Sequence, residues 1–147
     1  MELKTRLDEI IKYLADGYKA DSSLIKKPTG HYAYELGLTP STEPYFELQA
    51  LSSSDNTEDF CEVATTTVNI QINVYGVKTK VNNSSVTAQE HAMILADKCE
   101  TIMNNYKYSN DSITEMRKSM RSPTMPYYDG AKAYTTALRY QIVFNNY

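Results

Sequence analysis

The stretch VNIQINVYG, residues 68–76, alternates without a break between apolar and polar side chains. Alternation with a period of two predicts a β-strand that turns its Val and Ile side chains to a core. Residues 63–75 contain no charge, no Pro and no Gly, so this strand would be prone to aggregate if it lay at an exposed sheet edge. We therefore expect it to be flanked by other strands and covered on both faces.

The polar face of this strand has two interpretations. A neighbouring subunit could cover it, because neutral amides form hydrogen bonds across a contact without the desolvation cost of ions. Alternatively, the amides face water, as Asn and Gln mostly do in proteins. The first interpretation predicts a subunit interface made of Asn69, Gln71, Asn73 and Tyr75, with Asp55 and Asn56 from the preceding polar segment.

Residue spacing on both sides of this strand predicts two helices. Apolar residues three and four apart indicate an amphipathic helix over residues 3–18, which we expect Gly17 and the polar segment after it to end. Thr87 and Glu90 have the spacing of a capping box, so a second helix is expected to begin there. We expect the pair Asn104-Asn105 to end it.

Four strands are predicted in all, over residues 45–51, 60–75, 112–121 and 133–144. Between these elements we expect a Pro- and Gly-rich loop over residues 19–44, which a short extended piece at 31–36 interrupts. We also expect a polar turn over 52–59 and a connection over 76–85. The inward phase of the long strand changes within residues 64–67, which predicts a β-bulge or a strong bend there.

The predicted order is helix, loop, strand, strand, helix, strand, strand. This order favours an α+β fold, with an antiparallel or mixed sheet of about four main strands and both helices packed on one face. The chain of 147 residues contains no internal repeat and has the length of one domain, so we expect a single domain over residues 1–147.

Composition and charge exclude several classes of protein. The net charge of −3 is unlike that of a dedicated nucleic-acid binder, which needs a basic face. The apolar runs are a few residues long, far below the roughly 20 that cross a bilayer, and the start of the chain lacks the apolar core of a signal peptide. We therefore expect a protein that stays in the cytosol and does not contact membranes. The 13 Tyr residues favour an interface role, because Tyr is enriched at protein contacts.

Catalytic chemistry finds little support in the sequence. There is no Gly-rich phosphate loop, no metalloprotease motif and no C-x-x-C pair. His31 and His91 have no neighbouring nucleophile or carboxylate that would make either of them a general base, so we interpret both as solvent or packing residues. Cys61 and Cys99 are expected to be buried thiols.

Two charged clusters are interpreted as ordinary surface. The acidic cluster lacks the regular ligand spacing of a calcium loop and is expected to be a solvated turn; it consists of Asp55, Glu58, Asp59 and Glu62. A short basic patch could contact phosphate or an acidic partner, although three charges in five residues are more often simple surface; it consists of Arg117, Lys118 and Arg121.

The order of elements and several segments resemble the tail-terminator and neck proteins of long-tailed bacteriophages. The similarity lies in an N-terminal amphipathic helix, a Pro/Gly-rich connection, the strand opening EPYFEL at residues 43–48 and the polar segment after it. It continues through the long strand that ends in Tyr75, the helix that begins near Thr87, and ALRYQI at residues 137–142. These segments span nearly the whole chain, and the motifs are patterns of residue type.

This resemblance implies a structural virion protein that assembles in the host cytoplasm. Members of the family form rings, usually hexamers, that cap the tail tube, end its polymerisation and join it to the head. The implied partners are therefore sister copies, the tail-tube protein and the head connector, while DNA passes through the hole without specific binding. The resemblance implies no cofactor, no metal and no catalytic residue.

Two other functions remain open. The first is a head-closure or adaptor protein of the phage neck. The second belongs to another class, a small cytosolic enzyme or ligand-binding domain, which needs a pocket where polar groups converge. The residues to inspect for that pocket are His91, Cys99, Tyr106 and Arg139.

Overall fold

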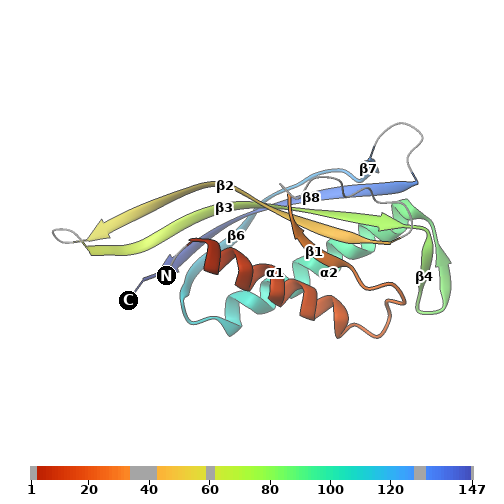
Figure 1. Cartoon of the computed structure of the whole chain (residues 1–147), viewed down its shortest axis with the longest axis horizontal. Helices are drawn as coiled ribbons and strands as arrows, with labels where there is room; N and C mark the ends of the chain where they lie inside the picture. The colour runs from red at the N-terminus through yellow and green to blue at the C-terminus, as the bar shows by residue number, and fades with distance from the viewer. Residues whose placement is uncertain (1–2, 34–42, 59–61, 128–131, 147) are drawn as a thin grey trace.

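The computed structural model describes residues 3–33, 43–58, 62–127 and 132–146. Two helices cover one face of a six-stranded sheet (Figure 1). The sheet runs in the order β1-β2-β3-β8-β6, and β7 pairs with β8 beside this path. The β1–β2 pair is parallel and the other pairs are antiparallel. The predicted α+β class and the order of the main elements are confirmed, although the strands are more numerous than four.

The strands divide into one large sheet and a small hairpin. Those of the large sheet are β1 (Thr29–Tyr32), β2 (Tyr45–Glu58), β3 (Glu62–Val77), β6 (Ile113–Arg121), β7 (Met125–Pro126) and β8 (Ala133–Asn145). The small hairpin contains β4 (Thr79–Val81) and β5 (Ser84–Val86).

The alternating stretch forms the centre of the sheet. β3 pairs with β2 on one side and with β8 on the other, so the expected flanking by strands is confirmed. Its apolar face lies against the helices, and Ile70 and Ile72 are 0% exposed. Complete burial of such a side chain contributes about 1.5–3 kcal/mol to the free energy of unfolding. This strand therefore fixes which face of the sheet the helices cover.

The predicted polar turn at residues 52–59 is wrong, because β2 continues through it to Glu58. Ser53 pairs with Val68 and Asn56 pairs with Thr65, so the ladder with β3 satisfies this backbone. The polar composition reflects exposure to solvent and not a turn. We call the hairpin of residues 52–58 and 62–67 the arm; it projects past the end of the helices (Figure 1). The closing residues 59–61 lie outside the described residues.

Two β-bulges shape the arm. Ala50 pairs with Ile70 and Ser52 with Asn69, which leaves Leu51 as an extra residue on β2. A second register shift, between Asn56 and Thr57 on β2, leaves Ala64 as the extra residue on β3. The bulge predicted within residues 64–67 is therefore confirmed, while the bulge at Leu51 was not predicted. An extra residue increases local twist and bends the strand, which suits the base of a projecting hairpin.

The helix α1 (Leu3–Lys19) buries one stripe of side chains against the sheet. Those buried are Arg6, Leu7, Ile10, Leu14 and Tyr18. The expectation that Gly17 ends this helix is wrong, because the helix continues two residues beyond it. A Cβ at this position would lie 2.9 Å from side-chain atoms of Ile102, so the glycine permits a close approach between the two helices.

The helix α2 (Ala88–Ser109) begins at the predicted capping box. The Thr87 side chain accepts a hydrogen bond from the Glu90 backbone N–H, and the Glu90 side chain accepts one from the Thr87 backbone N–H. The predicted end at Asn104-Asn105 is wrong, since the helix runs to Ser109 and is capped by Asn110. Buried Met103 and Tyr106 continue the apolar stripe past the two asparagines. The packing of these two residues outweighs the weak helix propensity of the asparagines.

The predicted connection at residues 76–85 contains the hairpin of β4 and β5. Its two-residue turn consists of Asn82 and Asn83, with φ angles of 51° and 63°. Positive φ at both central residues is typical of a type I′ turn, which Asn tolerates better than most residues. The hairpin is fixed to the loop after α1 by a bridge between Leu24 and Val81.

Candidate assembly surface

The sheet face opposite the helices, which we call the open face, consists of cross-strand rows of polar side chains. Gln71 on β3 lies between Gln49 on β2 and Arg139 on β8. Asn73 lies between Glu47 and Ala137 in the next row. Both helices lie on the other face of the sheet (Figure 1), and β7 pairs with the start of β8 within the sheet.

The amides of β3 form hydrogen bonds across the open face. Gln71 Nε2 donates to Asn73 Oδ1 at 2.8 Å, and Arg139 Nε donates to Gln71 Oε1 at 2.8 Å. Asn69 Nδ2 donates to Ser52 Oγ at 2.9 Å. These three side chains of β3 are partly buried within the single chain. The open face is therefore an ordered polar surface, whose side chains hold one another in place.

The end of the open face near Tyr75 is aromatic. Tyr45 and Tyr75 stack with ring centroids 4.5 Å apart, and Tyr127 meets Tyr75 edge-on at 5.4 Å. The Tyr75 hydroxyl donates to Glu47 Oε2 at 3.3 Å. Burial raises the pKa of the Glu47 carboxyl and of the Tyr45 and Tyr75 phenols. Tyr45 and Tyr75 are each 5% exposed and pack within the chain, whereas Tyr127 is 42% exposed and can offer its apolar ring and polar hydroxyl to a protein contact.

The structure separates the two residues of the arm that the sequence assigned to the interface. Asn56 shares the face of Asn69, and its amide donates to Thr65 and Thr67 hydroxyls at 3.2 Å and 3.3 Å. Asp55 lies on the opposite face, where it accepts from the Thr66 hydroxyl at 2.8 Å. There it lines a cleft of about 210 Å³ under the arm, beside Arg6 and Phe144. Asp55 therefore does not belong to the same surface as the amides.

Sequence reasoning missed the two charges that border the amides. Glu47 lies opposite Asn73, and Arg139 lies opposite Gln71. The alternation in the sequence already places both residues on the side of their strands opposite to the apolar side chains. Their pairing partners depend on the register between strands, which the alternation within one strand does not determine, and the bulge at Leu51 shifts that register along β2.

The four residues that an enzyme would need do not converge. His91 and Cys99 are buried on α2, and burial raises the pKa of the Cys99 thiol to about 12. The hydroxyl of Tyr106 accepts from Asn110 Nδ2 at 3.0 Å near the other end of that helix. Arg139 lies on the open face, across the sheet from all three. The prediction of buried thiols is confirmed for Cys99, whereas Cys61 lies outside the described residues.

His91 is a packing residue that joins α2 to β3. It is 0% exposed, and its Nδ1 accepts a hydrogen bond from the Val77 backbone N–H at 3.0 Å. Its Nε2 is buried without a hydrogen-bond partner in the part of the chain that the structure describes. Burial lowers the pKa of this imidazole, because a charged ring would lose its hydration. The nearby positive charge of Lys26 acts in the same direction.

We expect the stability of the chain to fall as the pH drops below about 6.5, the usual pKa of an unfolded His. The unfolded state then binds a proton that folded His91 resists, which lowers the free energy of unfolding by up to about 1.4 kcal/mol per pH unit. Thermal unfolding between pH 5 and 7 measures this slope. The variant His91→Asn keeps an acceptor for Val77 N–H but cannot be protonated, so its slope should be flatter. An unchanged slope would contradict this role of His91.

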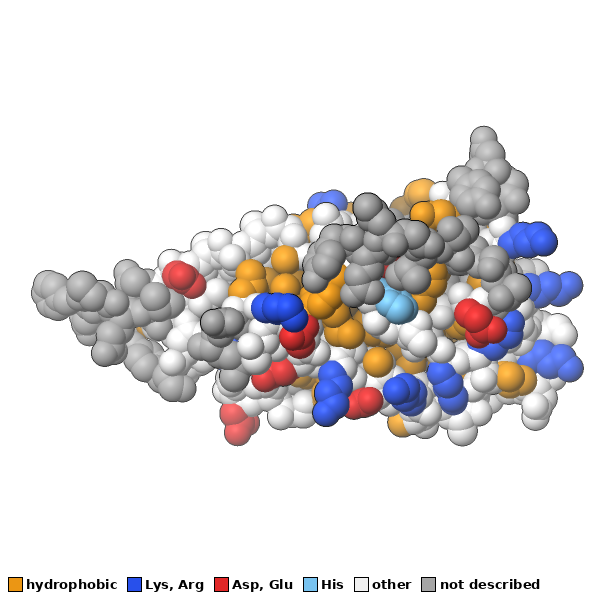
Figure 2. All heavy atoms as spheres, in the orientation of Figure 1, with side chains coloured by type: hydrophobic (Ala, Val, Ile, Leu, Met, Phe, Trp, Pro, Cys, Tyr) orange, Lys and Arg blue, Asp and Glu red, His pale blue; other side chains and the backbone are white. Residues whose placement is uncertain are grey.

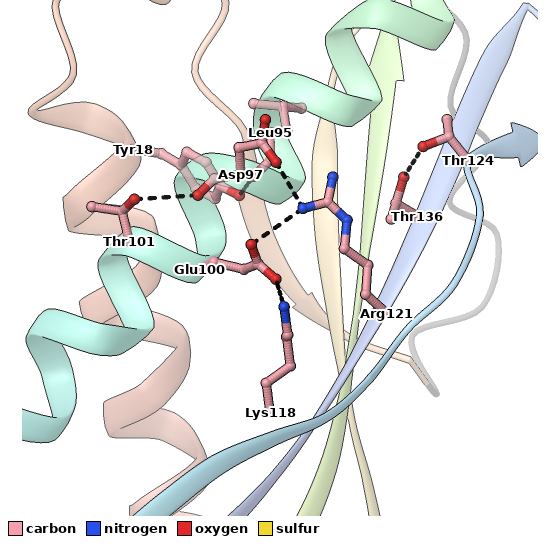
Figure 3. Close-up of polar contacts among 9 residues, drawn as sticks. All are labelled: Tyr18, Leu95, Asp97, Glu100, Thr101, Lys118, Arg121, Thr124 and Thr136. Carbon is pink, nitrogen blue, oxygen red and sulfur yellow. Dashed lines mark hydrogen bonds and ion pairs between the residues drawn. The ribbon is translucent and has the colours of Figure 1, made fainter.

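The predicted basic patch is occupied by contacts within the chain. Arg121 Nη1 lies 2.7 Å from Asp97 Oδ1 and 3.2 Å from Glu100 Oε2. Lys118 also pairs with Glu100, so two cations of β6 point at carboxylates of α2 (Figure 3). These ion pairs are partly exposed and join the last helix to an edge strand. The remaining cation of the patch, Arg117, is exposed.

The acidic cluster identified in the sequence lies mostly on the strands of the arm, and one of its members lies outside the described residues. Asp55 lies on β2, and Asp59 lies outside the described residues. Within the described residues, no group of three or more His, Cys, Asp or Glu is placed to hold a metal ion.

A comparison with protein-family models and with curated proteins finds no match to this chain. No helix in the described ranges has the length and apolar character needed to cross a membrane.

Proposed function

We propose that this chain is a structural subunit of a long-tailed bacteriophage. In this proposal it forms a ring, of six copies in related proteins, that caps the tail tube, ends its polymerisation and joins the tube to the head. Its partners are sister copies, the tail-tube protein and the head connector. DNA passes through the hole of the ring, and the function requires no cofactor. The sequence resemblance described above supports this assignment.

The open face is the observation that carries the proposal. Its central strand has no charge between residues 63 and 75, and its amides are partly buried and hydrogen-bonded within the chain. At one end of this face Tyr127 is 42% exposed, whereas Tyr45 and Tyr75 are already buried within the chain. A sheet face of this composition is suited to burial against another protein, because few ions would have to be desolvated.

The shape of the chain also supports assembly into a ring. A cyclic ring needs two different contact surfaces on each copy, since its contacts are heterologous. The projecting arm can supply one of them, and it extends from the same pair of strands, β2 and β3, as the open face (Figure 1). A contact on the arm and a contact on the open face therefore act on the same two hydrogen-bonded strands.

The experiment that tests the proposal examines phage particles that lack this protein. The phage that encodes it should then produce overlong or malformed tails in electron micrographs, because nothing stops the polymerisation of the tube. Supplying the chain from a plasmid should restore the wild-type tail length. Heads that leak DNA beside tails of normal length would instead support the head-closure alternative, and normal infectious particles would refute both roles.

A further inference from the structure

The end of the molecule at the β4–β5 hairpin carries a cluster of lysines. The bridge between Leu24 and Val81 places the segment after α1 alongside β4, and Asn82 N–H donates to the Ser23 carbonyl at 3.0 Å. Lysines from both segments gather there, and Figure 2 shows Lys and Arg side chains grouped at this end. We call this surface the lysine end, and its cations are Lys26, Lys27, Lys78 and Lys80.

The charges of the lysine end are only partly compensated within the chain. Lys26 lies 3.9 Å from the exposed carboxylate of Glu43, and Lys27 donates to the Asp21 carbonyl. Lys78 and Lys80 are exposed and have no ion pair with the described residues. The same segment presents Ile25, which is 59% exposed. An exposed apolar residue among cations fits a partner surface that is acidic and also offers apolar contact.

The arm has the complementary charge. Residues 52–67 contain four acidic residues and no basic residue. Of these four, Asp55, Glu58 and Glu62 belong to the described strands β2 and β3. The exposed Leu51 at the base of the arm, 41% exposed, supplies an apolar side chain. The arm and the lysine end lie at opposite ends of the long axis of the molecule (Figure 1).

We propose that the arm of one copy docks on the lysine end of the next copy in the ring. This inference rests on the proposed function and names the contact that links neighbouring copies. Two complementary patches at opposite ends of a chain cannot meet each other within one copy, so they produce a head-to-tail contact between two. Charge complementarity also sets the direction of the contact, because arm against arm and lysine end against lysine end would repel.

A carbodiimide that joins carboxylates to amines at contact distance tests the docking directly. The full chain, concentrated in buffer of low ionic strength, should give a ladder of covalent oligomers. Mass spectrometry should find Asp55, Glu58 or Glu62 linked to Lys78 or Lys80. Because these residues lie at opposite ends of one chain, each such link joins two copies. Links that avoid the lysine end altogether would overturn the proposed docking.

Charge reversal tests the same contact by its specificity. Lys78→Glu with Lys80→Glu, or Asp55→Lys with Glu58→Lys, should weaken association at least about tenfold, because like charges then face each other. Equal amounts of the two variants should associate with each other, since a reversed arm fits a reversed lysine end. The control variant Lys12→Glu with Lys19→Glu changes two exposed lysines of α1 by the same charge and should associate like wild type.

The outcomes separate this inference from the proposed function. If both reversals assemble like the control, the docking is overturned while a ring held by other surfaces stands. If the lysine reversal loses binding to a DNA duplex but keeps its assembly, the lysine end contacts nucleic acid and the docking is again overturned. If the wild-type chain forms no oligomer, either alone or on purified tail tubes, the proposed function itself fails.

Discussion

The paired substitution Gln71→Glu with Asn73→Lys is expected to abolish self-association while the chain stays folded. Each new charge lies opposite a residue of the other sign on a neighbouring strand, Arg139 for position 71 and Glu47 for position 73. Cross-strand pairs of opposite charge are mildly stabilising, so the fold should tolerate the change. The open face would then present four charges, and covering them with another protein would require their desolvation.

Sedimentation or light scattering of the full chain, alone and with tail tubes, measures the association. The reversed pair, Gln71→Lys with Asn73→Glu, places like charges opposite each other and should lose association together with some thermal stability. A control with the same net change, Gln89→Glu with Asn104→Lys, alters exposed amides of α2 on the far side of the sheet. If the first pair assembles as well as this control, the open face is not an interface.

The largest expected effect on stability comes from Gly76→Ala. A Cβ at position 76 would lie 2.2 Å from the Ala92 backbone nitrogen and 2.7 Å from its Cα. Both atoms belong to the first turns of α2, so the helix itself must move away from β3. Overpacking of this kind costs about 1–3 kcal/mol, and we expect the upper part of this range because no flexible side chain can yield. The midpoint of thermal unfolding should fall by about 6–12 °C.

Gly17→Ala provides the matched control for this prediction. Its Cβ would meet Ile102 side-chain atoms at 2.9 Å, and these can shift more easily than a backbone. The gain in helix propensity from Gly to Ala, about 1 kcal/mol, also offsets part of the clash. Calorimetry of both variants should therefore show a much smaller change for Gly17→Ala. Equal unfolding midpoints for the two variants would contradict the argument.

The sequence predicts the elements whose local signals agree with their tertiary environment. The alternation in residues 68–75 and the capping box at Thr87 and Glu90 both correspond to observed structure. The first strand of the arm, residues 52–58, is predicted as a turn because Ser, Asp and Asn favour turns in isolation, whereas pairing with β3 decides its conformation. Asn82-Asn83 forms the turn of the β4–β5 hairpin, and Asn is a residue that favours such turns. The pair lies within a short polar connection, where no hairpin is predicted from the sequence.

The candidate surface was predictable only in part. The outward parity of Asn69, Gln71 and Asn73 follows from the sequence, because strand side chains alternate. The neighbours of these amides do not follow from it, since they depend on how far each strand slides against the next. Alternation puts Asp55 and Asn56 on opposite faces, and the bulge at Leu51 determines that Asn56, and not Asp55, shares the open face.

The stacked rings of Tyr45 and Tyr75 give the open face an optical signal of its own. The chain has 13 Tyr and no Trp, so tyrosine dominates its near-ultraviolet absorption and its intrinsic fluorescence. Two phenol rings held 4.5 Å apart couple electronically, and this coupling contributes to circular dichroism in the tyrosine band. Tyr127, which is 42% exposed, meets Tyr75 edge-on, so a protein that covers this end of the open face changes the surroundings of the cluster, and association can be followed in the unlabelled chain by spectroscopy.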